Sequence, residues 1–278
     1  MRETWGLLDS GHCDAATNMA IDEALLTWHS EGKIPPTIRF YGWSKPSLTV
    51  GQFQNVGSAI DFSGVEKHQC EFVRRLTGGS AVLHDDELTY SIIVSENHPK
   101  IPSTINKAYY VLAQGLLEGY RMLGVDATFA EAEKNVGNRS DVCFETSAIY
   151  EMMVDGKKIS GNAQTRMKGV LLQHGSIPLS FNAEMLFDLF RFPNNDIRNK
   201  QRLKFIDKAV SINDIIDKKQ TYETILPAFL KGFQNSLHIS TEELTLDKTQ
   251  WDFIEHLRTT KYATETWNQP NKRQTGSV

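Results

Sequence analysis

Two residues of the chain could carry out acyl transfer together. Cys143 lies in the segment SDVCFE (140–145), fifteen residues before Lys158. A thiolate can accept an acyl group as a thioester, and nearby cations lower the pKa of a thiol. A lysine ammonium can stabilise the negative charge that develops on the attacked carbonyl oxygen. The alternative interpretation of Cys143 is a small buried side chain without a chemical role.

A glycine-rich segment with two arginines is the other unusual feature. It reads RRLTGGSAVLH from Arg74 to His84. Its adjacent glycines permit backbone conformations that other residues resist, and they let the chain approach a long, thin substrate. A plain glycine hairpin with exposed arginines is the alternative. His84, and His174 further along, are interpreted more readily as hydrogen-bonded structural histidines than as bases.

The elements that must position these residues come from the periodicity of apolar residues and from turn signals. An Asp155-Gly156 turn predicts a hairpin in which only one of Lys157 and Lys158 points inward. Thr17 or Asn18 is expected to cap the first helix. Residues 130–139 read as a mobile loop. We expect strands at 5–9, 37–43, 47–51, 70–75, 87–94, 149–154, 157–161 and 169–179, and helices at 16–29, 58–69, 103–123, 184–190, 211–217, 221–237 and 248–259.

This order of elements predicts an α+β fold, with a mixed β-sheet catalytic domain at 1–240. A small helical C-terminal segment at 241–270 should pack on it, and residues 271–278 should form a disordered tail. The stretch 191–208 is rich in Lys and Arg. It either docks an acidic carrier protein or is an ordinary solvated surface.

Composition narrows the function classes. The 278 residues carry a net charge of -4, which argues against a nucleic-acid-binding protein. No signal peptide or membrane-spanning run is expected. The three cysteines form no CxxC pair, which favours a cytoplasmic protein with free thiols and no metal site. P-loop, dinucleotide, zinc-protease and α/β-hydrolase motifs are lacking in the sequence.

Taken together, the segments resemble the biotin/lipoate protein ligase superfamily, and within it the LipM-type octanoyltransferases. Along nearly the whole chain, the similar segments are NMAIDEAL (18–25), RFYGWSKP (39–46), GQFQ (51–54), the glycine-rich segment 74–84, KISG (158–161) with Ala163 and Gln164, and KYATETWN (261–268). Ser80 replaces the third glycine of the ligase pattern, and Thr89 stands where lipoate ligases usually have Asn.

The resemblance implies transfer of an octanoyl group from octanoyl-acyl carrier protein to a lysine of the glycine-cleavage H protein or another lipoyl domain, in lipoate biosynthesis. Cys143 matches the cysteine that carries the acyl thioester, and Lys158 matches the superfamily's characteristic lysine. No cofactor or metal is implied, and a monomer is expected. The implied substrate contacts are Arg75, Thr77, Gly78, Gly79, His84, Gly161, Gln164 and His174.

Three other functions remain open from the sequence. An ATP-dependent lipoate-protein ligase would need free acid and ATP, and it would not depend on Cys143. An amidotransferase would take a lipoyl or octanoyl group from an already acylated protein. A non-catalytic acyl-binding protein would bind without turnover. Ser80 and Thr89 both argue against the ligase.

Overall fold

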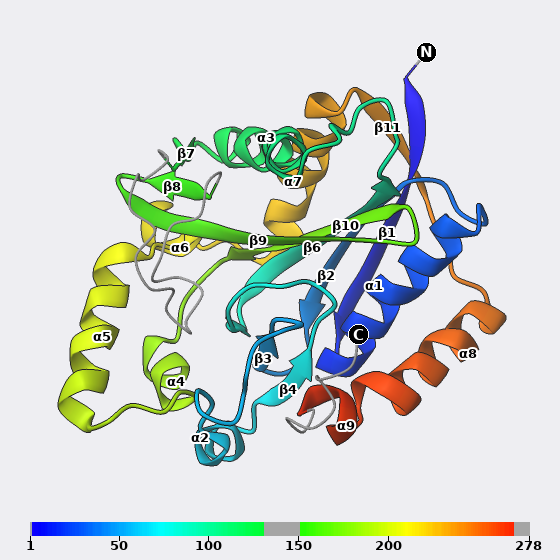
Figure 1. The fold of residues 1–278 in the computed structure, drawn as a ribbon. Helices are drawn as coiled ribbons and strands as arrows, with labels where there is room; N and C mark the ends of the chain where they lie inside the picture. Colours follow the sequence, from blue (N-terminus) through cyan, green and yellow to red (C-terminus); the bar gives the residue numbers. More distant parts are fainter. Residues whose placement is uncertain (1, 131–150, 270–278) are drawn as a thin grey trace.

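A large mixed β-sheet forms the centre of the molecule, with helices on both faces (Figure 1). The computed structural model describes residues 2–130 and 151–269. The sheet has eight strands in the order β11-β1-β2-β6-β10-β9-β8-β7, and a smaller sheet has the order β4-β3-β5. β1 runs parallel to both of its neighbours, whereas β2, β6, β10, β9, β8 and β7 pair in antiparallel fashion. The α+β prediction is therefore confirmed.

The strands and helices have the following bounds. The strands are β1 (Glu3–Cys13), β2 (Thr37–Trp43), β3 (Ser47–Val50), β4 (Glu71–Arg74), β5 (Val82–His84), β6 (Glu87–Ser95), β7 (Thr128–Phe129), β8 (Met152–Val154), β9 (Lys157–Met167), β10 (Val170–Pro178) and β11 (Ile239–Glu243). The helices are α1 (Ala15–Ser30), α2 (Phe62–Lys67), α3 (Ile105–Met122), α4 (Ala183–Asp188), α5 (Asn195–Lys208), α6 (Ile212–Ile215), α7 (Tyr222–Ser236), α8 (Lys248–Leu257) and α9 (Glu265–Asn268), with a π-helical turn at Arg258–Tyr262 between the last two.

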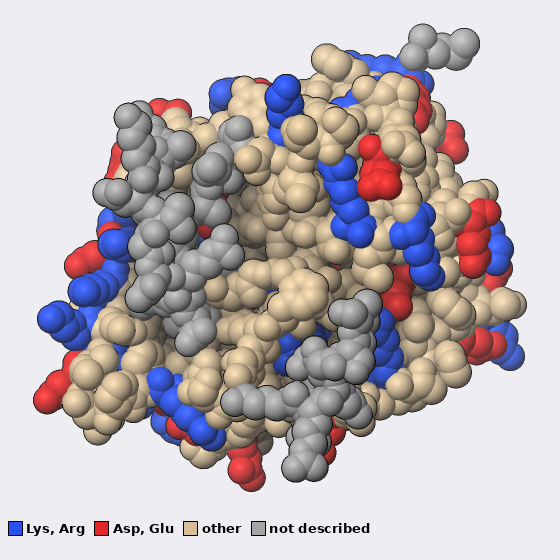
Figure 2. Space-filling view, viewed as in Figure 1, with Lys and Arg blue, Asp and Glu red and all other residues tan. Residues whose placement is uncertain are grey.

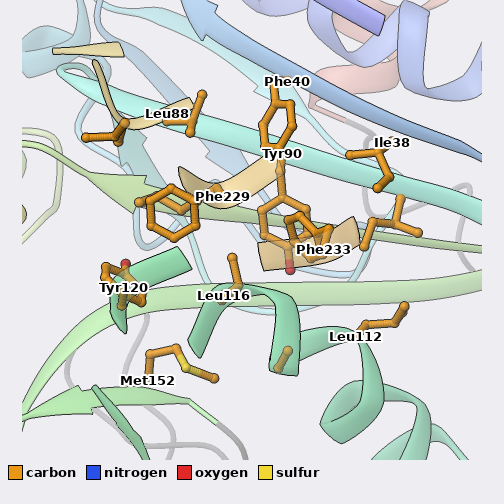
Figure 3. Packing of buried hydrophobic residues seen from close by; sticks show 14 of the residues in the cluster. Ile38, Phe40, Leu88, Tyr90, Leu112, Leu116, Tyr120, Met152, Phe229 and Phe233 are labelled. Carbon is orange, nitrogen blue, oxygen red and sulfur yellow. The ribbon is translucent and has the colours of Figure 1, made fainter. Parts of the chain in front are cut away.

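Helices α3 and α7 cover one face of the large sheet. Figure 3 shows Phe229 and Phe233 of α7 in the core under these helices, with the Phe233 ring next to that of Tyr90 of β6. The two helices approach each other closely because Gly119 leaves no side chain in the way. A Cβ there would come within 2.3 Å of the Phe229 ring. Glycine is thus required for this packing.

Helices α1 and α8 cover the opposite face and pack against each other. Asp14, and neither Thr17 nor Asn18 as predicted, caps α1, because its carboxylate accepts a hydrogen bond from the backbone N–H of Thr17 at 2.8 Å. Asn18 is instead buried and uses its side chain to bind Gly42 and Arg39. The cap lies one turn earlier than the apolar periodicity suggested.

The smaller sheet packs with α2, α4 and α5 into a third cluster of buried residues. β4 runs parallel to β3, and β5 runs antiparallel to it, so both strands pair with β3. The glycine-rich segment therefore connects two strands that flank a third. The interpretation as a glycine hairpin with exposed arginines is wrong, because Arg74 and Arg75 are 2% and 4% exposed.

Several regular elements escaped prediction, among them the short elements β5, β7 and α9 and two longer ones. β11 pairs with β1 at the edge of the large sheet, and α5 fills the stretch that the sequence marked as basic. The helix predicted at 58–69 is shorter and covers only α2. The predicted hairpin is present, with positive φ angles of 49° at Asp155 and 75° at Gly156.

Some expectations lie outside the described residues. These are the mobile loop beyond Ala130, the segment around Cys143, and the disordered tail at 271–278. The division at residue 240 stays a prediction, and β11 lies across that boundary. Within residues 2–130 and 151–269, no helix combines the length and the apolar character needed to cross a bilayer.

Candidate functional site

A pocket lies between the α1-covered face of the large sheet and the smaller sheet. It encloses about 460 Å³, including the part that is open to solvent. Its wall is mostly apolar and aromatic, with a few polar groups, as is typical of small-molecule sites. The residues that line it are Met19, Tyr41, Trp43, Thr49, Arg75, Gly79, Val82, His84, Thr89, Gly161, Asn162, Ala163, His174, Gly175 and Ser176.

Arg75 organises the glycine-rich segment from inside. Its Nε donates to the Thr77 hydroxyl at 3.0 Å. Its Nη2 donates to the backbone oxygens of Gly78 and Ser80 at 2.8 and 2.9 Å, and its Nη1 donates to the Oγ1 and backbone oxygen of Thr49. These bonds use all five N–H groups of the guanidinium. Arg75 therefore shapes the pocket wall, and no N–H group remains for a substrate.

Arg74 fixes the same segment to the C-terminal end of the chain. Its guanidinium donates to the backbone oxygens of Gly51, Gln54 and Asn268 at distances of 2.7 to 3.0 Å. The Asn268 side chain in turn accepts the Arg74 backbone N–H at 2.8 Å. A positive charge that is buried this deeply is stabilised by several carbonyl oxygens at once. The closing segment of the sequence is thus a structural part of the pocket region.

A first chain of polar groups runs from Arg75 to a buried carboxylate. Arg75 donates to Thr49 Oγ1 at 3.1 Å, Thr49 Oγ1 contacts His84 Nε2 at 2.9 Å, and His84 Nδ1 contacts Glu87 at 2.8 Å. Since an ionised carboxylate only accepts, a neutral His84 carries its proton on Nδ1 and accepts from the threonine hydroxyl at Nε2. The Trp43 ring stacks on the His84 ring with 4.2 Å between the ring centroids, and this stacking fixes the orientation of the His84 ring.

Glu87 collects hydrogen bonds from three residues. Besides His84, the hydroxyls of Ser176 and Thr89 donate to its carboxylate, Ser176 at 2.6 Å. Burial raises the pKa of the Glu87 carboxyl, but His84 and the hydroxyl donors outweigh burial, so the pKa lies below its usual value. Thr89, where lipoate ligases usually have Asn, also accepts a hydrogen bond from Trp43 Nε1 at 2.8 Å. It is an integral member of this buried network.

A second chain of the same composition runs from Arg75 to another carboxylate. Thr77 Oγ1 contacts His174 Nε2 at 2.6 Å, and His174 Nδ1 faces Asp22 at 3.4 Å. Asp22 forms a buried ion pair with Arg39 at 2.7 Å. Burial raises the pKa of Asp22, but Arg39 and His174 bring it below its usual value. Two arginine–threonine–histidine–carboxylate chains therefore diverge from one guanidinium and orient both pocket histidines.

We expect the protein to lose stability as the pH falls below about 7. Burial lowers the pKa of His174, although Asp22 acts in the opposite direction. An unfolded histidine titrates near pH 6.5. The unfolded state therefore binds the proton first, and stability is lost as the pH falls from the unfolded pKa toward the folded one. Urea unfolding at several pH values measures this slope. The low pKa values of Asp22 and Glu87 add a further loss only below pH ~4.

His174→Gln should flatten this slope below about pH 7. His256, which is exposed on α8, supplies the matched control, and His256→Gln should leave the slope unchanged. A slope that is equally steep in His174→Gln would show that another group causes it.

A β-bulge turns Lys158 toward Gly161, which lines the pocket. Met153 pairs with Lys158 and Met152 with Ser160, so Ile159 is an extra residue. Ile159 points into the core under α3 and α7. The bulge places Lys158 and Gly161 on the same face, which strict alternation would not allow. The Lys158 ammonium lies 3.8 Å from where a Cβ on Gly161 would stand.

The Lys158 side chain is 2% exposed and forms an ion pair with Glu151 at 2.5 Å. A buried ammonium needs such a partner, because desolvation of an isolated charge is very costly. The backbone of Lys158 is held by the segment after α5: it bridges to Ala209, and its oxygen accepts the Val210 N–H at 3.0 Å. Lys157, by contrast, is partly exposed, as expected of the outward neighbour.

The structure brings together most of the predicted site residues. Arg75, Gly79, His84, Gly161 and His174 line one pocket. Two other residues stand behind its wall: Thr77 holds His174, and the backbone oxygen of Gly78 accepts from Arg75.

Gln164 does not join the pocket. It bonds Gln173 at 3.0 Å, and Gln173 bonds Tyr90, whose ring belongs to the core under α3 and α7. Cys143 lies outside the described residues.

Sequence reasoning missed the three carboxylates Asp22, Glu87 and Glu151. Glu87 follows His84 by three residues, and this short spacing was a usable signal for a histidine–carboxylate pair. Asp22 lies far from Arg39 and His174 in sequence, so only the fold reveals their contact. Thr49 and Trp43 were likewise read only as strand residues, although both contact His84.

Comparison with known proteins shows which family of proteins this chain is similar to. A family model described as the lipoyl protein ligase A/B catalytic domain matches residues 14–234. The chain is 51% identical to an octanoyltransferase LipM of Oceanobacillus iheyensis over 263 residues, which is 95% of this chain and 96% of the relative. It is 50% identical to an octanoyltransferase LipM of Bacillus subtilis over 273 residues, 96% of this chain and 98% of the relative.

Solved structures of lipoate protein ligases are also similar to this chain. A lipoate-protein ligase A bound with ATP is similar with a TM-score of 0.77 and 26% identity, over 97% of this chain and 99% of the other. A putative lipoate protein ligase from T. acidophilum with bound lipoic acid is similar with a TM-score of 0.77 and 25% identity, over 98% of this chain and 100% of the other.

Proposed function

The chain belongs to the lipoyl protein ligase A/B catalytic-domain family, and we propose that within it the protein is an octanoyltransferase of lipoate biosynthesis. It takes an octanoyl group from octanoyl-acyl carrier protein and transfers it, through a thioester on Cys143, to a lysine of a lipoyl domain such as that of the glycine-cleavage H protein. The observation that carries the proposal is the buried Lys158 ammonium, held by Glu151 at the edge of a narrow apolar pocket.

The pocket suits a saturated chain. Tyr41, Trp43 and Val82 supply apolar wall, and Gly161 adds no side chain to it. Each buried methylene contributes about 0.8 kcal/mol. An octanoyl chain therefore gains much more binding energy here than a short acyl group.

The assignment of the nucleophile rests partly on the other two cysteines. Burial raises the pKa of the Cys70 thiol to about 12. Burial also raises the pKa of the Cys13 thiol. A raised pKa leaves little thiolate at neutral pH, and the thiolate is the reactive form. Of the three cysteines of the chain, Cys143 thus remains as the candidate, in agreement with its position in the family pattern.

The proposed reaction has two steps. The Cys143 thiolate attacks the thioester carbonyl of the donor, Lys158 stabilises the oxyanion, and the carrier leaves as a thiolate. The neutral amine of the acceptor lysine then attacks the Cys143 thioester. An amide bond forms, the Cys143 thiolate leaves, and the amine loses one proton. Exchange between thioesters is nearly neutral in energy and amide formation is downhill, so the proposal requires no ATP.

The direct test incubates the protein with octanoyl-acyl carrier protein and H protein without ATP, followed by intact mass spectrometry of all three proteins. We expect one octanoyl group on H protein, and one on the enzyme when the acceptor is withheld. Transfer only from free octanoate with ATP would identify a ligase instead. Transfer only from an acylated lipoyl domain would identify an amidotransferase. Acyl binding without turnover would exclude an enzyme of this type.

A further inference from the structure

Helix α5 is exposed on almost every side. It has 14 residues, and Phe205 is its only buried residue. Three of its large apolar side chains face solvent: Ile197, Leu203 and Ile206 are 37%, 59% and 48% exposed. Tertiary packing normally supplies most of the stability of a helix. A helix that contributes one residue to the core and displays apolar side chains outward is typical of a surface that binds a partner.

The outward side of α5 is also positively charged. The helix carries five Lys or Arg residues and two Asp residues. One of the five, Arg198, pairs with Asp188 at 2.7 Å. Figure 2 shows Lys and Arg side chains gathered at the left edge of the molecule, where Figure 1 places α5.

One stripe of α5 combines the basic and apolar groups. Spacings of three and four residues bring Lys200, Leu203 and Lys204 onto one side of the helix. Ile197 and Lys208 extend this stripe, and two acidic residues, Asp196 and Asp207, also lie on it. We name these seven residues the α5 face. All seven are exposed, so the face presents three lysines against two aspartates, around an apolar centre at Leu203.

The position of α5 connects this face to the proposed chemistry. The helix ends at Lys208, and the next residue, Ala209, bridges to the backbone of Lys158. A helix rises 1.5 Å per residue, so Ile197 lies roughly 18 Å along the axis from Ala209. The α5 face therefore begins near the backbone of Lys158 in β9 and extends away from that strand.

We propose that the α5 face docks the acidic acyl carrier protein that delivers the octanoyl group. This inference rests on the proposed function and names the surface that its donor uses. A carrier presents its thioester at the end of a long flexible arm, so it can dock along α5 while the acyl group enters the pocket. An acceptor lysine has only a four-carbon side chain, and its protein must sit at the pocket itself. The charge of the face selects an acidic partner.

The test compares two charge reversals of equal size. Lys200→Glu with Lys204→Glu inverts the α5 face. Lys231→Glu with Lys248→Glu inverts two exposed lysines on α7 and α8. For the α5 variant we expect the KM for octanoyl-acyl carrier protein to rise about tenfold or more. The KM for the acceptor and the turnover of a small octanoyl thioester should not change. The α7/α8 variant should behave as the wild type.

Binding without turnover gives an independent readout. Titration of the unacylated carrier into the wild-type protein should give a Kd that rises with salt, and the α5 variant should bind more weakly and with less salt dependence. An α5 variant with an unchanged KM and Kd for the carrier overturns the inference. A variant in which only the acceptor KM rises, or in which the turnover of the small octanoyl thioester also falls, overturns it as well. A wild-type protein that binds the carrier but transfers nothing overturns the proposed function and leaves this surface supported.

Discussion

Replacement of Cys143 by alanine should abolish both the octanoyl adduct and net transfer. Removing the nucleophile from a covalent mechanism eliminates the intermediate, so we expect the rate to fall by a factor of about 10³ or more. Intact mass spectrometry of the enzyme after incubation with octanoyl-acyl carrier protein measures the adduct. Initial rates of H-protein acylation measure the transfer. Both should be lost together, because the thioester precedes the amide on the same path.

The other two cysteines supply matched controls. Cys70→Ala and Cys13→Ala should still form the adduct, since burial raises the pKa of both thiols. Cys70→Ala should lower stability slightly, because it shortens a buried side chain. If Cys143→Ala instead keeps full transfer, the covalent mechanism is incorrect. If that variant acylates the acceptor only from free acid and ATP, the ligase alternative holds.

Strong local signals account for the elements that the sequence predicted well. Strand β2 is buried along its whole length and reads as a run of aromatic and β-branched residues. The Asp155-Gly156 turn has the two positive φ angles that this dipeptide favours. In α3, Leu112 and Leu116 recur one turn apart on the buried face. In each case the information lies within a few neighbouring residues.

β11 and α5 escaped prediction because their stability comes from elsewhere in the fold. β11 has one fully buried apolar residue, Ile239, and depends on pairing with β1 more than 200 positions earlier in the chain. α5 buries Phe205 alone, so no apolar periodicity marks it as a helix. Its charged residues suggested a surface, which is correct, but they carried no signal for its secondary structure.

The candidate site was likewise predictable only in part. The resemblance to a known family implied His84, His174 and Lys158 as site residues, and the structure places His84 and His174 in one pocket and Lys158 beside it. The partners that orient them could not be read from the sequence, because Asp22 and His174 are 152 positions apart and meet only when α1 packs on β10. The inward orientation of Lys158 also depends on a bulge, which is a property of strand pairing.

Replacement of Lys158 by methionine should reduce transfer by a factor of about 10² to 10³, the usual effect of removing one oxyanion donor. The same change leaves the Glu151 carboxylate buried without its ammonium, and breaking a buried pair in this way costs about 3–5 kcal/mol of stability. Initial rates with a small octanoyl thioester measure the first effect. Urea unfolding measures the second.

A matched pair of variants separates the two effects. Glu151→Gln combined with Lys158→Met also neutralises the carboxylate that has lost its ammonium, so most of the stability should return while transfer stays low. Glu151→Gln alone keeps the amine and should lose much less activity than Lys158→Met. A double variant that recovers transfer along with stability would mean that the lysine only supports the fold. If stability alone recovers, the ammonium acts on the reaction, and Glu151 is the residue that makes a charged group tolerable at this depth.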